Sequence, residues 1–235
     1  MDLAIESSNK TMSVALVDEG CVLSELTTTG QMQHAVSLMP AIEQVMTFAK
    51  LSPKDLTAIV IAKGPGSYTG IRIGGTTAKV LAKSLSVPLY PVSSLAALAK
   101  NAPSDWTGLL VPYMDARRQA VFTGAYRYCN GRLVEVIGDH YTPVDKWVEQ
   151  LSSLEEEVYL IGEGAKQVEW PSEWRQHPVN DAYPKAHYLV ELKEASVEAD
   201  LFEPSYLKRV EAEENWQAAH PEQEDKDPLE YVRYV

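Results

Sequence analysis

The chain has 235 residues, of which 45% are hydrophobic and 23% charged, as expected of a globular protein with one or two domains. Its formal net charge of −12 argues against tight nucleic-acid binding by this chain alone. No run is long enough to span a membrane, and the start of the chain has a strand pattern rather than a secretory leader. Together with two widely spaced cysteines, Cys21 and Cys129, these features predict a cytoplasmic protein.

The first part of the chain predicts strands and helices in a fixed order. The expected strands lie at residues 3–6, 12–17, 22–27, 58–62 and 88–92. The expected helices lie at residues 34–50, 70–85 and 94–100. The helix at 34–50 carries more apolar residues than contact with one sheet requires, which indicates a second apolar contact.

After a linker at residues 101–108, the same order of patterns begins again. The expected strands lie at residues 109–114, 120–126, 133–137 and 158–161. Helical spacing recurs around residues 147–154 and 185–195. Each half therefore reads as three strands, a helix, a strand and a helix, which predicts an internal duplication of a βββαβα unit.

The predicted organisation has two subdomains and a tail. Residues 1–104 form the N-terminal subdomain, with the glycine loop and partner-binding helices, and residues 105–210 form the C-terminal subdomain. Residues 211–235 are acidic and polar, with Pro221 and Pro228, and are expected to be a mobile tail.

A glycine loop joins the strand at 58–62 to the next helix. Gly64 and Gly66 permit backbone angles closed to other residues, and Ser67 can cap the helix. A loop of this kind at a helix N-terminus suits an anion. The residues expected to contact an anion or nucleotide, here and in the turns described below, are Ser7, Lys10, Gly64, Gly66, Ser67, Asp115 and Arg117.

The helix after the loop has two distinct faces. Its core face is expected to include Ile71, Ile73, Val80, Leu81 and Leu85. A second stripe of small residues recurs every fourth position, at Gly70, Gly74, Ala78 and Ala82. This stripe suits close approach of another backbone, either this protein's own sheet or a helix of a partner.

Residues 64–74, Gly-Pro-Gly-Ser-Tyr-Thr-Gly-Ile-Arg-Ile-Gly, closely resemble the most distinctive motif of the bacterial TsaB (YeaZ) family. Residues 114–118 and 204–209 resemble two less specific motifs of the same family. The family acts in tRNA threonylcarbamoyladenosine synthesis. The duplicated unit itself looks like the tandem ribonuclease-H-like α/β fold of the actin, Hsp70 and sugar-kinase superfamily, a likeness that does not carry function by itself.

The resemblance implies a non-catalytic subunit in threonylcarbamoylation of adenosine 37, in tRNAs that read codons beginning with adenine. Its partners would be a TsaD-type catalytic subunit of the same fold and a TsaE-type ATPase, and it would form a homodimer when alone. It would contact tRNA only through the complex. It would have no cofactor of its own, with ATP or ADP expected, if at all, in the complex.

The alternative is a stand-alone ATP-dependent small-molecule kinase or ATPase of the actin-like superfamily. Glu6 and Asp115 end equivalent predicted strands, where such a kinase would hold magnesium between its halves. However, the turn at residues 7–10 has no glycine with which to wrap a phosphate. The five histidines lack the HxxxH spacing of the family's catalytic partner, and His34 is followed one turn later by Leu38, so no metal site is expected.

The two helices of the first half are predicted to form the partner interface. If they lie side by side, they suit a four-helix contact with the same pair from a like-folded protein. The residues expected in this interface are Val36, Met39, Ile42, Met46, Gly70, Gly74, Ala78 and Ala82.

Overall fold

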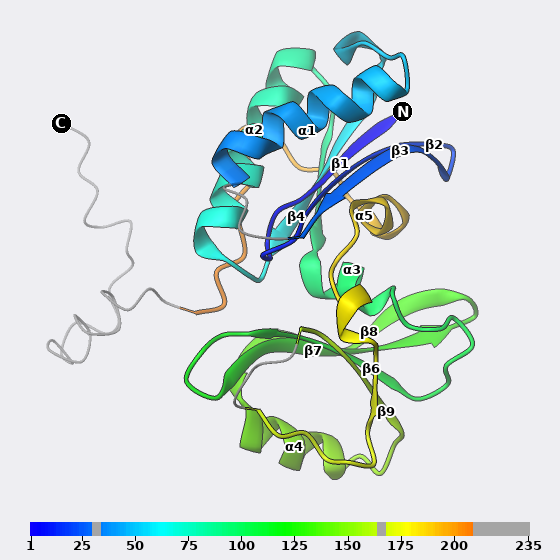
Figure 1. The fold of residues 1–235 in the computed structure, drawn as a ribbon, viewed down its shortest axis with the longest axis vertical. Coiled ribbons are helices and arrows are strands. Elements are labelled where there is room, and N and C mark those ends of the chain that lie inside the picture. The colour runs from blue at the N-terminus through cyan, green and yellow to red at the C-terminus, as the bar shows by residue number, and fades with distance from the viewer. Residues whose placement is uncertain (30–33, 164–167, 209–235) are drawn as a thin grey trace, which may run out of the picture.

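The computed structural model describes residues 1–29, 34–163 and 168–208, and it contains two five-stranded sheets (Figure 1). The strands of the first sheet are β1 (Asp2–Glu6), β2 (Met12–Asp18), β3 (Cys21–Thr28), β4 (Ala58–Gly64) and β5 (Leu89–Ser93). Those of the second are β6 (Leu109–Asp115), β7 (Ala120–Cys129), β8 (Arg132–Pro143), β9 (Val158–Ile161) and β10 (Arg175–Gln176). The helices are α1 (His34–Phe48), α2 (Tyr68–Leu85), α3 (Ser94–Ala99), α4 (Val144–Ser152) and α5 (Ala186–Leu192). Short 3-10 turns are η1 (Pro53–Asp55), η2 (Val179–Asp181) and η3 (Ala199–Leu201).

The two sheets share one topology. The strand orders are β3-β2-β1-β4-β5 and, in the second sheet read from its other edge, β8-β7-β6-β9-β10. In each sheet the first strand pairs antiparallel with the second and parallel with the fourth. This is the predicted tandem ribonuclease-H-like arrangement, so the duplication read from the sequence is confirmed.

Helices cover both faces of the first sheet (Figure 1). On one face, α1 and α2 pack on alternate side chains of β1, β2 and β4, including Leu3, Val14 and Ile59. On the other face, Ala4, Ala15 and Val60 meet α3 and α5. Burial of both faces explains why β1 and β4 are almost continuously apolar.

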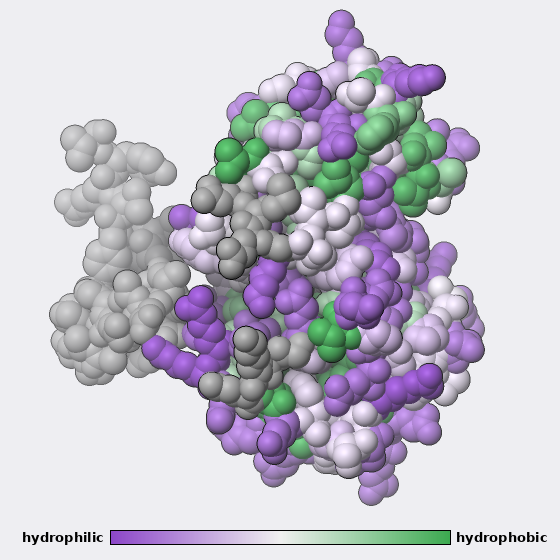
Figure 2. Space-filling view, viewed as in Figure 1, coloured by the Kyte–Doolittle hydropathy of each residue, from purple (hydrophilic) through white to green (hydrophobic). Residues whose placement is uncertain are grey.

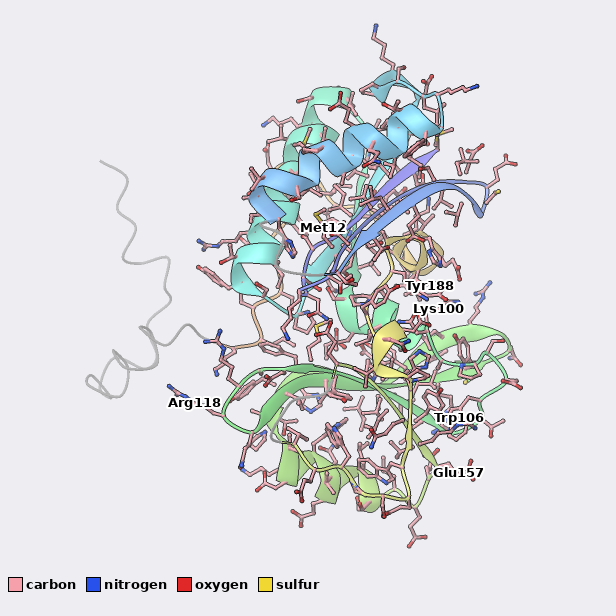
Figure 3. The ribbon with its side chains drawn as sticks, in the orientation of Figure 1. Met12, Lys100, Trp106, Arg118, Glu157 and Tyr188 are labelled. Carbon is pink, nitrogen blue, oxygen red and sulfur yellow. The ribbon has the colours of Figure 1, made fainter. Side chains whose placement is uncertain are left out.

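The second sheet lies between α3 and α4. Leu110, Met114 and Tyr126 face α3, whereas Leu109 and Val111 face the fully buried Trp147 of α4. Because α3 also contacts β4 and β5, it is the shared layer between the two sheets. Lys100, at the end of α3, lies beside Tyr188 of α5, with its amine 5.7 Å from the ring centroid (Figure 3).

The C-terminal part of the chain returns to the first sheet. Helix α5 packs on β1 and β2, and Val197 donates a backbone hydrogen bond to Leu89 at the edge of that sheet. Phe202 is 3% exposed in the same core as α2. The predicted C-terminal subdomain therefore includes two segments, α5 and residues 197–205, that contact the first sheet or α2. The predicted acidic tail falls outside the described residues.

Some element boundaries differ from the sequence prediction. Strand β8 continues to Pro143 rather than ending at residue 137, because register shifts near Ala125 keep it paired with β7 beyond Gly138. Strand β10 is two residues long and was not predicted. Within the described ranges, no helix is both long and apolar enough to cross a membrane.

Candidate functional site

The small-residue stripe of α2 faces the protein's own first turn. A side chain on Gly74 would place its Cβ 2.1 Å from the Ser7 hydroxyl, and one on Gly70 would lie 2.1 Å from the Ser7 carbonyl oxygen. Ala78 and Ala82 are 0% and 2% exposed in the same core. The stripe therefore packs against this protein's own residues, not on an open surface. The assignment of Gly70, Gly74, Ala78 and Ala82 to a partner interface is therefore corrected.

Helix α1 divides its apolar residues between the core and the surface. Ile42 and Met46 are each 6% exposed and belong to the core of the first sheet, so their assignment to a partner interface is also corrected. Val36 and Met39 are 65% and 52% exposed. Val80 of α2, expected in the core, is 58% exposed. We call Val36, Met39 and Val80 the outer helix face, and Figure 2 shows apolar surface on the half of the molecule that carries these helices.

The glycine loop is closed by the turn after β1. The Ser67 amide donates to the Ser8 carbonyl oxygen at 2.6 Å. Gly66 has φ +155°, and a Cβ added to it would lie 2.1 Å from the same oxygen. The Ser67 hydroxyl caps α2 by accepting from the Gly70 amide at 3.3 Å. These contacts hold the loop in one conformation. Because glycine has no side chain, the turn after β1 can approach the loop and the start of α2 closely.

Two more of the predicted anion contacts are used inside the chain. Ser7 is 1% exposed, and its hydroxyl donates a hydrogen bond to the Gly70 carbonyl oxygen at 2.9 Å. Gly64, with φ +103°, is enclosed by Ile71 and the carbonyl oxygen of Ser205. Ser7, Gly64, Gly66 and Ser67 therefore have structural contacts within the chain, and contact of these four residues with an anion or nucleotide stays a prediction.

Glu6 and Asp115 lie in different environments. Glu6 is fully buried, and burial raises the pKa of its carboxyl to about 7 although the Ser8 amide donates to Oε1 at 2.6 Å. Asp115 is exposed, and its Oδ1 accepts from the Arg117 amide at 2.8 Å, in a turn where Arg117 has φ +64°. Glu6 is thus enclosed by the protein, whereas Asp115 is an exposed carboxylate that accepts a hydrogen bond within its own turn.

The exposed members of the predicted anion set lie at the turns. The Lys10 amine is 3.5 Å from Glu163 Oε2, so an ion pair links the first turn to the end of β9. Arg118, next to Arg117, projects outward from the turn between β6 and β7 (Figure 3). For Lys10, Asp115 and Arg117, contact with an anion or nucleotide stays a prediction. In the described part of the chain, no group of three His, Cys, Asp or Glu side chains could hold a metal ion.

A polar cluster that the sequence did not indicate joins the two sheets. Asp139 of β8 binds the hydroxyl of Ser93, which caps α3, and the hydroxyl of Tyr126. Burial is the main reason that the pKa of Asp139 is raised. No short-range pattern connects residues 93, 126 and 139, so only the tertiary structure could reveal this cluster.

The last described residues form a second exposed feature. We call residues 197–208 the C-terminal strap. Its Tyr206 ring lies 5.1 Å from the ring of Tyr68 and accepts, through its hydroxyl, a hydrogen bond of 3.1 Å from Nε of Arg72. Lys208 reaches across to the carbonyl oxygen of Ala116 at 3.3 Å. The strap therefore touches both the start of α2 and the turn after β6.

Comparison with known sequences gives consistent results. A family model described as "TsaD: tRNA N6-adenosine threonylcarbamoyltransferase" matches residues 21–176. The tRNA threonylcarbamoyladenosine biosynthesis protein TsaB of Bacillus subtilis is 44% identical over 160 residues, which cover 68% of this chain and 69% of that protein. The TsaB protein of Haemophilus influenzae is 26% identical over 221 residues, covering 88% and 92% of the two chains.

Solved structures support the same relationship. A Pseudomonas aeruginosa protein described as uncharacterized, with similarity to peptidase YEAZ, has a TM-score of 0.77 at 26% identity, covering 88% of this chain and 99% of its own. A structure of YeaZ from the same organism has a TM-score of 0.73 over the same shares of the two chains. These similarities extend across both sheets.

Proposed function

Because the chain belongs to the TsaB (YeaZ) family and so takes part in tRNA threonylcarbamoyladenosine biosynthesis, we propose that it serves there as a non-catalytic subunit. The observation that carries this proposal is the burial of Glu6 at the end of β1. A kinase of this fold would need that carboxylate ionised and open to magnesium, whereas here it is enclosed and its pKa is about 7. The same burial argues against the stand-alone kinase or ATPase.

The histidine pattern supports the same role. The five histidines lie at positions 34, 140, 177, 187 and 220, and no two are four residues apart. The chain therefore lacks the HxxxH motif that the resemblance assigns to the catalytic partner. Threonylcarbamoyl transfer to adenosine 37 would then take place on a TsaD-type subunit, with a TsaE-type ATPase as the third member.

The outer helix face is the surface that we propose for the TsaD-type partner. Val36, Met39 and Val80 are apolar and exposed on two helices that cover one face of the first sheet. Burial of such side chains contributes about 25 cal/mol per Å² of apolar surface removed from water. The same face would support a homodimer when the partner is absent, since a like-folded subunit and a second copy offer similar helices.

We place the nucleotide and the tRNA in the complex, and the protein in the cytoplasm. The net charge of −12 disfavours a phosphate backbone on this chain alone, so the basic surface would come from a partner. The glycine loop is closed by Ser8, which leaves Lys10, Asp115 and Arg117 as the residues that could reach ATP or ADP from this side.

Reconstitution of the tRNA modification tests the proposal. The TsaD-type subunit, the TsaE-type ATPase and a source of threonylcarbamoyl-adenylate should modify adenosine 37 only when this chain is added. The purified chain alone should turn over no ATP with magnesium. Substantial turnover that Asp115→Asn abolishes would instead establish the kinase or ATPase alternative.

A further inference from the structure

Arg72 lies in an exposed aromatic setting at the start of α2. Its guanidinium carbon is 4.2 Å from the ring centroid of Tyr68 and 5.8 Å from that of Tyr206. Its Nε donates to the Tyr206 hydroxyl at 3.1 Å. The two tyrosines are 40% and 43% exposed, so the whole group faces solvent.

The strap holds Tyr206 in place. Two residues away, the Phe202–Pro204 segment packs on Gly75, where an added Cβ would lie 2.9 Å from the Phe202 ring. The Ser205 amide donates to the Lys63 carbonyl oxygen at 2.7 Å. Because both ends of this segment are fixed on the first sheet and α2, Arg72 is oriented before any ligand arrives, which reduces the entropy cost of binding.

Within residues 1–29, 34–163 and 168–208, the terminal nitrogens of Arg72 have no hydrogen-bond or ion-pair partner. Among the described residues, Nε has the Tyr206 hydroxyl as its partner, and no carboxylate lies within ion-pair distance of the guanidinium. Neighbouring cations on the same helix are already engaged: Lys79 donates to the carbonyl oxygens of residues 200 and 202, and Lys83 pairs with the Asp200 carboxylate. One oriented guanidinium, with two terminal nitrogens that no described residue binds, suits a single planar oxyanion bound in bidentate geometry.

We propose that Arg72, held by Tyr68 and Tyr206, binds a carboxylate side chain of the partner subunit. This inference rests on the proposed function, because it extends the partner contact from the outer helix face to the start of α2. Tyrosine and arginine beside exposed apolar residues are the composition of interface hot spots. A nucleic-acid phosphate is disfavoured, since backbone binding needs several free Lys and Arg, whereas Lys79 and Lys83 are engaged and the chain carries a net charge of −12.

The test is the affinity of three variants for the purified TsaD-type subunit, measured by titration calorimetry. Arg72→Gln should weaken binding about tenfold or more, because it removes the positive charge and the pair of N–H donors that would bind the carboxylate. Arg72→Lys should restore only part of the loss, and Tyr206→Phe should weaken binding a few-fold by releasing Nε. Lys83→Gln is the matched control on the same helix, and its affinity should stay within twofold of the wild type.

The outcomes separate this inference from the function on which it rests. If the wild-type chain does not bind the TsaD-type subunit at all, the proposed function fails and the inference with it. If the wild type binds and Arg72→Gln binds equally well, only the inference fails. A loss of tRNA binding by the isolated Arg72→Gln chain, with partner affinity unchanged, would assign the site to phosphate and also overturn it. Both Arg72 variants should keep the wild-type melting temperature, because Arg72 is exposed.

Discussion

The hydroxyl of Ser7 occupies the space that a side chain on Gly74 would need. An added Cβ would lie 2.1 Å from Ser7 Oγ but 3.3 Å from Ser7 Cβ and from Ile61 Cδ1. The obstacle is therefore one atom. The same hydroxyl donates to the Gly70 carbonyl oxygen, which ties the turn after β1 to the start of α2.

Gly74→Ala should lower the free energy of unfolding by about 1–3 kcal/mol, since overpacking at Ser7 outweighs the gain of about 1 kcal/mol in helix propensity. Ser7→Ala in the same chain should recover part of the loss, because only the 3.3 Å contacts would remain. Urea denaturation of the two single variants and the double variant measures this coupling. Purely additive effects would show that Ser7 is not the obstacle.

Ala78→Arg should abolish the cooperative melting transition. Ala78 is fully buried, so an arginine there would place an unpaired charge in the core of the first sheet. Thr76→Arg, an exposed position on the same helix, should melt like the wild type. A folded Ala78→Arg chain that merely fails to join the complex would restore the small-residue stripe as an interface.

Val36→Arg and Met39→Arg should each weaken association with the TsaD-type subunit more than tenfold, because they replace an exposed apolar contact with a charge. Thermal melting should not change, since neither residue belongs to the core. Val134→Arg, an equally apolar exposed position on β8, is the control. Size-exclusion chromatography of the mixed subunits gives the answer, and equal complex formation by all three variants would contradict the proposed surface.

Stability should depend on pH through Glu6. The pKa of this carboxyl rises from 4.5 to about 7 in the folded protein, so the folded state keeps its proton where the unfolded chain loses it. The contribution of Glu6, about 3 kcal/mol at most, is present below about pH 4.5 and is lost as pH rises through about 7.

Glu6→Gln imitates the protonated form and should therefore be more stable than the wild type at pH 8, with little difference at pH 4.5. Urea unfolding of both proteins at several pH values measures the difference. The pKa of Asp139 is also raised, so the stability of both proteins should fall somewhat as the pH rises. The effect of Glu6 is therefore the difference in stability between the two proteins at each pH. A difference that does not change with pH would contradict the assignment.

The sequence predicted the fold well because the duplicated pattern is local: apolar runs such as β4 and a glycine loop such as residues 64–70 carry their own conformational signals. On α2 the core face was predicted correctly for Ile71, Ile73, Leu81 and Leu85 and wrongly for Val80, but the sequence left open what the small-residue stripe contacts. Gly70 and Gly74 look like a docking stripe until the tertiary structure places Ser7 against them. The contacts of Asp139 with Ser93 and of Tyr206 with Arg72 could not be predicted either, because the partners are 46 and 134 positions apart along the chain.

The return of the strap to α2 also sets an order of events during synthesis. Phe202 covers Gly75, yet more than a hundred residues separate it from β5, the last strand of the first sheet. At ribosomal rates this corresponds to a delay of roughly 5 to 20 seconds. During that interval the residues of the first sheet and of α2 have been synthesised, but Phe202, which packs in the same core, has not. The nascent chain therefore leaves this part of its first core exposed to chaperones and to aggregation until residue 202 has left the ribosome.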